Sequence, residues 1–141
     1  MKEKYFGPVM KKICEEMDRR ANLEIKKYHL TISQARVILF LAEKEEKTVT
    51  QKELEDYLQV SHPTTVTIIK SMEAKRMVET FLDDADRRMK NVKLIWGNEE
   101  IYRELSQNAE NMETRLLEGF SEKEEEQFLS FLNRAYKNAV K

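Results

Sequence analysis

The chain has 141 residues, a formal net charge of −1 and 36% charged residues, with only three glycines and two prolines. These values predict one helix-rich domain, with or without helical extensions, and argue against disorder. No run approaches the roughly 18 apolar residues of a membrane span, and the single cysteine has no partner for an internal disulfide. We therefore expect a cytoplasmic protein with no membrane partner.

The first 47 residues predict two helices. Apolar residues recur every three or four positions from Phe6 to Ala21, which indicates an amphipathic helix over about 6–27. Thr31 and Gln34 then form a capping-box pattern that opens a second helix over about 31–46. Because this second helix is apolar nearly all round in its middle, we expect it to lie centrally.

The stretch from 48 to 95 is the most informative part of the chain. A capping box at Thr50 opens a short helix to Leu58, a break follows at 59–61, and a second helix is predicted over about 62–75. Residues 78–82 and 91–95 then read as two strands around a polar tip rich in arginine and aspartate. A helix-turn-helix followed by such a wing fits duplex DNA, with a helix in the major groove and the cationic hairpin in the minor groove.

The charge of this region does not by itself predict nucleic-acid binding. Residues 50–95 contain eight basic and eight acidic side chains, so the region is neutral and carries no strong polybasic patch. DNA binding would therefore depend on basic side chains facing the phosphates while the acids face away.

The C-terminal third predicts two more helices, one capped by Asn98 and running to about Leu117, the other opened by a capping box at Ser121 and running to about Val140. Together with the first helix, these helices carry more apolar side chains than a small winged domain can cover, so we predict a homodimer. The predicted interface consists of Phe6, Val9, Met10, Ile13, Phe128, Phe131, Leu132 and Tyr136. A two-fold dimer would present two recognition helices to a pseudo-palindromic DNA site.

The predicted fold class is mainly α with a small two- or three-stranded β wing, in which a winged helix-turn-helix core is flanked by N- and C-terminal dimerisation helices. Within one structural domain, we expect an N-terminal dimerisation helix over 1–30, the DNA-binding core over 31–96 and the C-terminal dimerisation helices over 97–141.

Residues 58–73, with Val78 and the wing triplet Asp86-Arg87-Arg88, resemble the MarR family of dimeric bacterial transcription regulators, and the helix order agrees over nearly the whole chain. The resemblance implies a repressor that binds an operator in double-stranded DNA and is released by a small, aromatic or amphipathic effector. It places Ser61 as the cap of the recognition helix and Arg88 in the minor groove. The predicted DNA-binding residues are Ser61, His62, Pro63, Thr64, Thr67, Lys70, Ser71, Asp86, Arg87, Arg88 and Lys90.

Several positions depart from the family pattern. Ser71 and Thr80 stand where arginines are common, and Asp83 and Asp84 add negative charge at the wing tip. These departures motivate an alternative function, a protein-interaction module on a winged-helix scaffold with weak DNA affinity. Arg76 stands where the family usually has glycine, which predicts a differently built turn after the recognition helix.

Other classes of site find little support in the sequence. Cys14 allows a redox-sensing regulator as a further alternative, but its place in an apolar stripe favours a packed, inert thiol. With His29 and His62 as the only histidines and no Cys/His cluster, we predict no metal and no cofactor. Three scattered glycines cannot form a phosphate-cradling loop, and no nucleophile–base pattern is present, so we expect no enzymatic activity.

Overall fold

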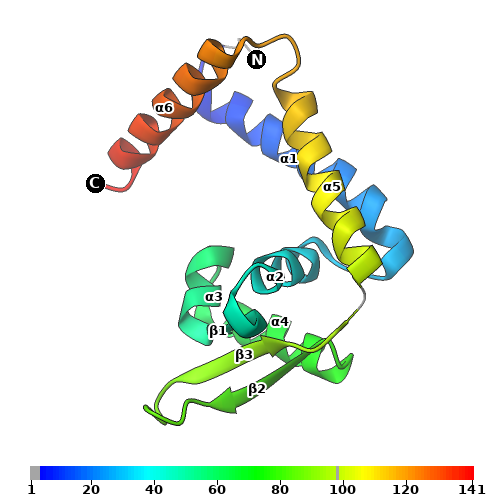
Figure 1. The fold of residues 1–141 in the computed structure, drawn as a ribbon. Coiled ribbons are helices and arrows are strands. Elements are labelled where there is room, and N and C mark those ends of the chain that lie inside the picture. The colour runs from blue at the N-terminus through cyan, green and yellow to red at the C-terminus, as the bar shows by residue number, and fades with distance from the viewer. Residues whose placement is uncertain (1–3, 98) are drawn as a thin grey trace. The chain divides into compact units, whose positions relative to one another are not determined.

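The computed structural model describes residues 4–97 and 99–141 (Figure 1). In chain order the described residues form α1 (Phe6–Ile25), a 3-10 turn (Lys26–Tyr28), α2 (Ile32–Ala42), β1 (Thr48–Thr50), α3 (Gln51–Leu58), α4 (His62–Ala74), β2 (Val78–Leu82), β3 (Lys90–Leu94), α5 (Glu99–Leu116) and α6 (Glu122–Ala139). This order confirms the predicted fold class. Asn98, the predicted cap of α5, lies outside the described residues.

The chain divides into two units. The first, residues 1–108, contains α1 to β3 and the first part of α5, and the second, residues 109–141, contains the end of α5 and all of α6. The predicted DNA-binding residues all belong to the first unit.

Three predicted capping boxes are present, and each fixes the start of a helix. Thr31, Thr50 and Ser121 each accept a hydrogen bond from the backbone N–H three residues later, and the Gln or Glu at that position reaches back to the cap. α2 nevertheless ends at Ala42, four residues before the predicted end. Lys44 has an extended backbone, with φ −90° and ψ 155°, which ends the helical conformation, and Thr48 begins a strand.

The sheet has the strand order β1-β3-β2 and is antiparallel throughout. β2 and β3 form the predicted hairpin, with Val78 opposite Leu94 and Leu82 opposite Lys90. β1 was not predicted as a separate strand, and it pairs Val49 with Val92. This pairing attaches the wing to the start of the helix-turn-helix (Figure 1).

The core of the first unit lies where α2, α3, α4 and the sheet meet. Its most completely buried side chains are Val37, Ile38, Leu41, Leu54, Thr65, Ile69, Met72 and Val92. On α4, Thr65, Ile69 and Met72 are buried, whereas Val66 is only half-buried. The Thr65 hydroxyl is satisfied by donating to the Ser61 carbonyl oxygen at 3.1 Å, which removes the cost of burying it.

The buried Gln34 joins α2 to the end of α4. Its side-chain carbonyl accepts the Thr31 backbone N–H, and its amide donates to the Ser71 hydroxyl at 3.2 Å. The Lys75 ammonium lies 3.5 Å from the same Gln34 carbonyl oxygen. A capping residue that the sequence predicted for α2 alone therefore also positions the end of α4.

The turn after α4 is closed by a left-handed residue. Arg76 has a φ of +58°, its N–H donates to the Glu73 carbonyl, and the Met77 N–H donates to the Met72 carbonyl. This is the Schellman arrangement that usually contains glycine. The prediction of a differently built turn is therefore wrong, because arginine adopts the glycine-like conformation.

The terminal helices bury little of their apolar surface. Only Ile25 is buried on α1, and no residue of α6 is buried. Cys14 is exposed, so the prediction of a packed thiol is wrong for the chain by itself. Among the described residues, no helix is both long enough and apolar enough to span a membrane.

Candidate nucleic-acid interface

The first turn of α4 presents polar side chains to solvent. Ser61 caps the helix by accepting the Thr64 N–H at 3.3 Å, and Pro63 occupies the first turn, where its missing N–H costs nothing. The predicted DNA-binding residues of this helix are all exposed: Ser61, His62, Pro63, Thr64, Thr67, Lys70 and Ser71. The opposite face of the helix carries the buried Thr65, Ile69 and Met72.

The hydroxyls on this face have defined roles. The Ser61 hydroxyl donates to the Thr64 hydroxyl oxygen at 2.9 Å, which leaves the Thr64 proton able to donate outward. The Thr67 hydroxyl donates to the Pro63 carbonyl at 3.0 Å, which leaves its oxygen lone pairs as acceptors. The face therefore offers both a donor and an acceptor, the two groups that base edges in a major groove require.

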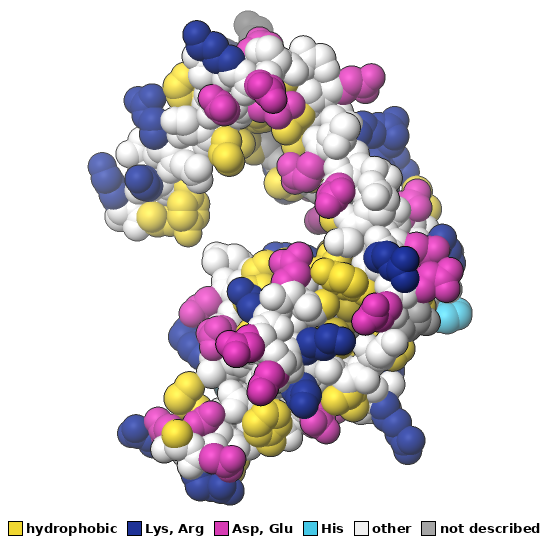
Figure 2. Space-filling view, viewed as in Figure 1, with side chains coloured by type: hydrophobic (Ala, Val, Ile, Leu, Met, Phe, Trp, Pro, Cys, Tyr) yellow, Lys and Arg dark blue, Asp and Glu magenta, His cyan; other side chains and the backbone are white. Residues whose placement is uncertain are grey.

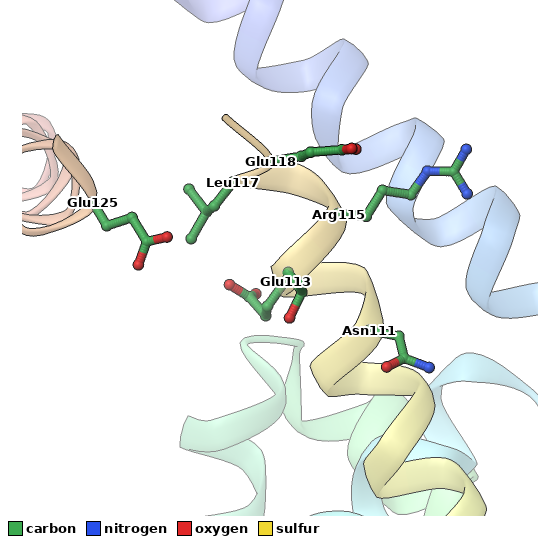
Figure 3. Close-up of a pocket in the computed structure, with 7 residues that line it drawn as sticks. Asn111, Glu113, Arg115, Leu117, Glu118 and Glu125 are labelled. Atoms are coloured by element: carbon green, nitrogen blue, oxygen red, sulfur yellow. The ribbon is translucent and has the colours of Figure 1, made fainter. Parts of the chain in front are cut away.

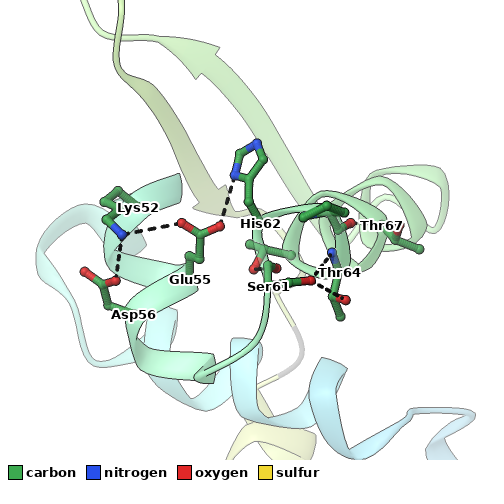
Figure 4. Close-up of polar contacts among 9 residues, drawn as sticks. Lys52, Glu55, Asp56, Ser61, His62, Thr64 and Thr67 are labelled. Carbon is green, nitrogen blue, oxygen red and sulfur yellow. Dashed lines mark hydrogen bonds and ion pairs between the residues drawn. The ribbon is translucent and has the colours of Figure 1, made fainter. Parts of the chain in front are cut away.

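The histidine at the start of α4 is held by an acid of α3. Glu55 Oε1 lies 3.0 Å from His62 Nδ1, and Glu55 Oε2 lies 3.6 Å from Lys52 Nζ (Figure 4). Lys52 also pairs with Asp56 at 3.0 Å, and this hydrogen bond and charge, with a smaller contribution from Glu55, raise the pKa of the Lys52 ammonium. We call Lys52, Glu55, Asp56 and His62 the α3–α4 cluster. Sequence reasoning did not find Glu55, because only the turn at 59–61 brings it to His62.

The tip of the wing is built by aspartates. Asp83 Oδ2 accepts the backbone N–H groups of Ala85 and Asp86, each at 3.0 Å, and Asp83 Oδ1 accepts the Asn91 amide at 3.1 Å. These hydrogen bonds, led by that from Asn91, lower the pKa of the Asp83 carboxyl. Asp83 is therefore a structural residue of the turn, whereas its sequence position alone suggested only added negative charge.

The predicted minor-groove arginine is paired within the wing. Asp86 accepts Arg88 Nε at 3.1 Å and Arg88 Nη2 at 3.2 Å, and this pair lowers the pKa of the Asp86 carboxyl. The Arg88 side chain is still 91% exposed, so the pair orients the guanidinium without withdrawing it from solvent. Arg87 and Lys90 are also exposed, and Asp86 is half-buried.

Basic and acidic side chains alternate on the visible surface of the winged region. In Figure 2, Lys/Arg and Asp/Glu side chains lie next to one another around the tip of the hairpin, with hydrophobic side chains beside them. Phe81, Leu82 and Met89 are exposed there. This mixture of signs agrees with the equal numbers of basic and acidic residues in 50–95. The exposed basic side chains that could contact phosphates are therefore few, and they lie at the wing tip and on α4.

Two hollows lie away from these residues. In the first unit, a cavity of about 130 Å³ is lined by Ile38, Ala42, Lys47, Leu94, Trp96, Gly97, Glu99 and Tyr102. In the second unit, an open hollow of about 710 Å³ follows the end of α5 and the start of α6 (Figure 3). Its lining includes the carboxylates of Glu113, Glu118 and Glu125, which makes it unsuited to a phosphate backbone.

Comparison with known families decides the assignment of the winged region. The model of the MarR family matches residues 29–89, which run from the end of the 3-10 turn to the wing tip. Over these residues the chain is similar to the MarR family. The resemblance predicted from the recognition helix and the wing is confirmed, and the fold is that of MarR-family transcription regulators, which are not enzymes.

Solved structures agree in fold over nearly the whole chain. A Staphylococcus aureus MepR–DNA complex is 23% identical, with a TM-score of 0.87, and the match covers 96% of this chain and 99% of MepR. Bordetella bronchiseptica BpsR is 17% identical with a TM-score of 0.80, covering 96% of each chain. A MarR-family regulator from Silicibacter pomeroyi is 21% identical with a TM-score of 0.77, covering 94% of this chain and 89% of its own. No curated protein sequence matches the chain.

Proposed function

We propose that this chain is a transcriptional repressor that binds a pseudo-palindromic operator as a homodimer and releases it when a small molecule binds. The observation that carries the proposal is the exposed, hydrogen-bond-ready face of α4, in the same unit as a wing tipped by an oriented arginine. α4 would enter the major groove with His62, Thr64 and Thr67 near base edges, and Lys70 would contact a phosphate. Arg88 would enter the adjacent minor groove.

The exposed apolar faces of α1 and α6 support the homodimer. Phe6 is 83% exposed, and Phe131 and Tyr136 are 57% and 59% exposed. Burying large aromatic side chains against another surface stabilises a protein, and a second copy of the same chain would bury them in a symmetric interface. We assign the proposed interface to Phe6, Val9, Met10, Ile13, Phe128, Phe131, Leu132 and Tyr136, as the sequence predicted.

The cavity beside Trp96 supports the effector. Trp96, Tyr102 and Leu94 supply an apolar lining, while Lys47 and Glu99 supply charges of both signs. Such a lining suits a small aromatic molecule with a polar group. Among the similar structures, DNA binding by BpsR is regulated by 6-hydroxynicotinic acid, and MepR forms a complex with DNA. An effector here would act by favouring a conformation that binds DNA less well.

A protein-interaction module with weak DNA affinity is the second candidate. The Gln34–Ser71 hydrogen bond favours it, because it engages a side chain that would otherwise contact DNA, and so does the even charge count of residues 50–95. The two candidates differ in their response to salt, since a protein that neutralises phosphates releases counterions and binds more weakly as salt rises.

Fluorescence anisotropy tests the proposal. The purified protein is titrated against labelled duplex from just upstream of its own coding region, with a random duplex as control, at about 50 and 200 mM salt. We expect tighter binding to the upstream duplex, a steep loss of affinity at the higher salt, and weaker binding by Lys70→Ala and Thr64→Ala. Equal, salt-insensitive binding to both duplexes would reject the repressor and favour the interaction module.

A further inference from the structure

We propose that Glu55 is a positioning residue that holds the neutral His62 ring as its Nδ1–H tautomer, so that His62 Nε2 reads an amino group on a base edge. This inference rests on the proposed function, because it requires α4 to enter the major groove. It concerns a residue of α3 that would not itself need to touch DNA.

The first step is the hydrogen bond between the two side chains. Glu55 Oε1 lies 3.0 Å from His62 Nδ1, at the start of α4. An ionised carboxylate can only accept hydrogen bonds, so Nδ1 must carry the proton. In the neutral ring, Nε2 is then left as an acceptor.

The second step is the difference in exposure. The Glu55 side chain is only 14% exposed, whereas the His62 side chain is 66% exposed. Figure 4 shows the second ring nitrogen of His62 on the side of the ring away from the Glu55 carboxylate. The carboxylate is thus sheltered and the accepting nitrogen faces outward from the helix start.

The third step is the charge around the pair. Lys52 Nζ lies 3.6 Å from the other oxygen of Glu55 and 3.0 Å from Asp56. The ammonium is therefore shared between two carboxylates and offsets only part of the negative charge that they would otherwise present to a phosphate backbone.

The chemistry of the base edges gives the consequence. In the major groove, adenine N6 and cytosine N4 carry donor amino groups, whereas guanine offers only the acceptors N7 and O6. A histidine whose Nε2 accepts therefore favours an amino group of adenine or cytosine at the position it contacts. We expect about a tenfold preference at one position in each half-site.

Selection from a randomised duplex library tests this inference, using the full-length protein and four variants. Glu55→Leu removes the acceptor, and Glu55→Gln retains an acceptor oxygen without the charge. Asp56→Leu is the matched control, because it removes a neighbouring carboxylate that also pairs with Lys52 and does not contact His62 in the structure. His62→Ala identifies the position that the ring reads.

We expect Glu55→Leu and His62→Ala to lose the preference at the same half-site position, and Glu55→Gln and Asp56→Leu to keep it. Loss of affinity without a change in base frequencies would indicate a structural role and overturn the inference. If the wild-type protein selects no motif, both this inference and the repressor fall. If it selects a motif that Glu55→Leu leaves unchanged, only this inference falls.

Nitrogen-15 NMR of the histidine rings gives a second test that requires no DNA and no variant to fold. At a pH where the ring is neutral, we expect His62 as the Nδ1–H tautomer, with the exposed His29 as the internal reference. An Nε2–H tautomer at His62 in the wild-type protein would overturn the inference.

Discussion

The winged region and the terminal helices differ in how completely their apolar side chains are buried. In the winged region, Leu41, Leu54 and Met72 are completely buried within one chain. On α6, Leu129, Phe131 and Tyr136 are more than half exposed, and none of the residues of that helix is buried. The contrast teaches that the winged region is stabilised by its own core, whereas the apolar side chains of α6 are left largely uncovered within the single chain.

The largest expected effect is a loss of stability in the core of the winged region. Leu54→Ala leaves a cavity in a fully buried site, so we expect a loss of about 2–5 kcal/mol in the free energy of unfolding. Urea unfolding at low protein concentration measures it. Leu129→Ala on α6 removes the same atoms from a 61% exposed site, and an equal loss there would contradict the comparison.

The next largest effect concerns the proposed dimer interface on α6. Phe131→Glu places a charge in the proposed dimer interface, and we expect the dissociation constant of the dimer to rise at least about a hundredfold. Sedimentation velocity over a concentration series measures this change. Asn133→Glu adds the same charge to an exposed position outside the proposed interface and is the control. If both variants dimerise like the parent, α6 does not hold the dimer together.

A third change sharpens the role of the wing. Arg88→Ala removes the guanidinium that Asp86 orients, and we expect affinity for the selected duplex to fall about tenfold with a shallower dependence on salt. Anisotropy measures both quantities. Arg19→Ala removes an equal charge from α1, where Arg19 pairs with Glu16, and should leave DNA affinity unchanged. Equal losses in the two variants would show that only total charge matters.

A smaller effect concerns the turn that joins α4 to the wing. Arg76 has a φ of +58°, a conformation that costs L-residues free energy and glycine almost none. We expect Arg76→Gly to raise the free energy of unfolding by about 0.5–1 kcal/mol, as measured with urea. The neighbouring Lys75 has a φ of −85°, so Lys75→Gly should lower it. Destabilisation by both variants would contradict this account of the turn.

The smallest effect is the pH response of the wing tip. The pKa values of the Asp83 and Asp86 carboxyls are lowered, so both groups bind protons less readily in the folded than in the unfolded chain. Their stabilising contribution is full above the pKa of an unfolded aspartate, about 3.9, and is lost as the pH falls through the lowered folded values. Carboxyl NMR titration of Asp83 and Asp86 measures this. Ordinary titration of Asp83 and Asp86 would contradict the hydrogen bonds of the tip.

What the sequence could predict was set by the range of the interactions. The capping boxes at Thr31, Thr50 and Ser121 depend on residues three apart, and all three are present. β1 escaped prediction because three residues form a strand only when β3, some forty residues later, supplies the hydrogen bonds.

The site shows the same limit. Side chains on the outer face of α4 follow from helix periodicity, so their exposure was predictable. The contact of Glu55 with His62 depends on how the turn at 59–61 folds. The hydrogen bonds that Asp83 accepts depend on how the turn at the wing tip folds.

The number of chains bound to one operator duplex tests the central claim most directly, because the proposed interface on the terminal helices predicts a dimer on DNA. Native mass spectrometry of the complex with a duplex obtained by selection measures this number. The account predicts two chains on each duplex and a single chain after Phe131→Glu. One chain on each duplex for the wild-type protein, with unchanged affinity in the variant, would contradict it.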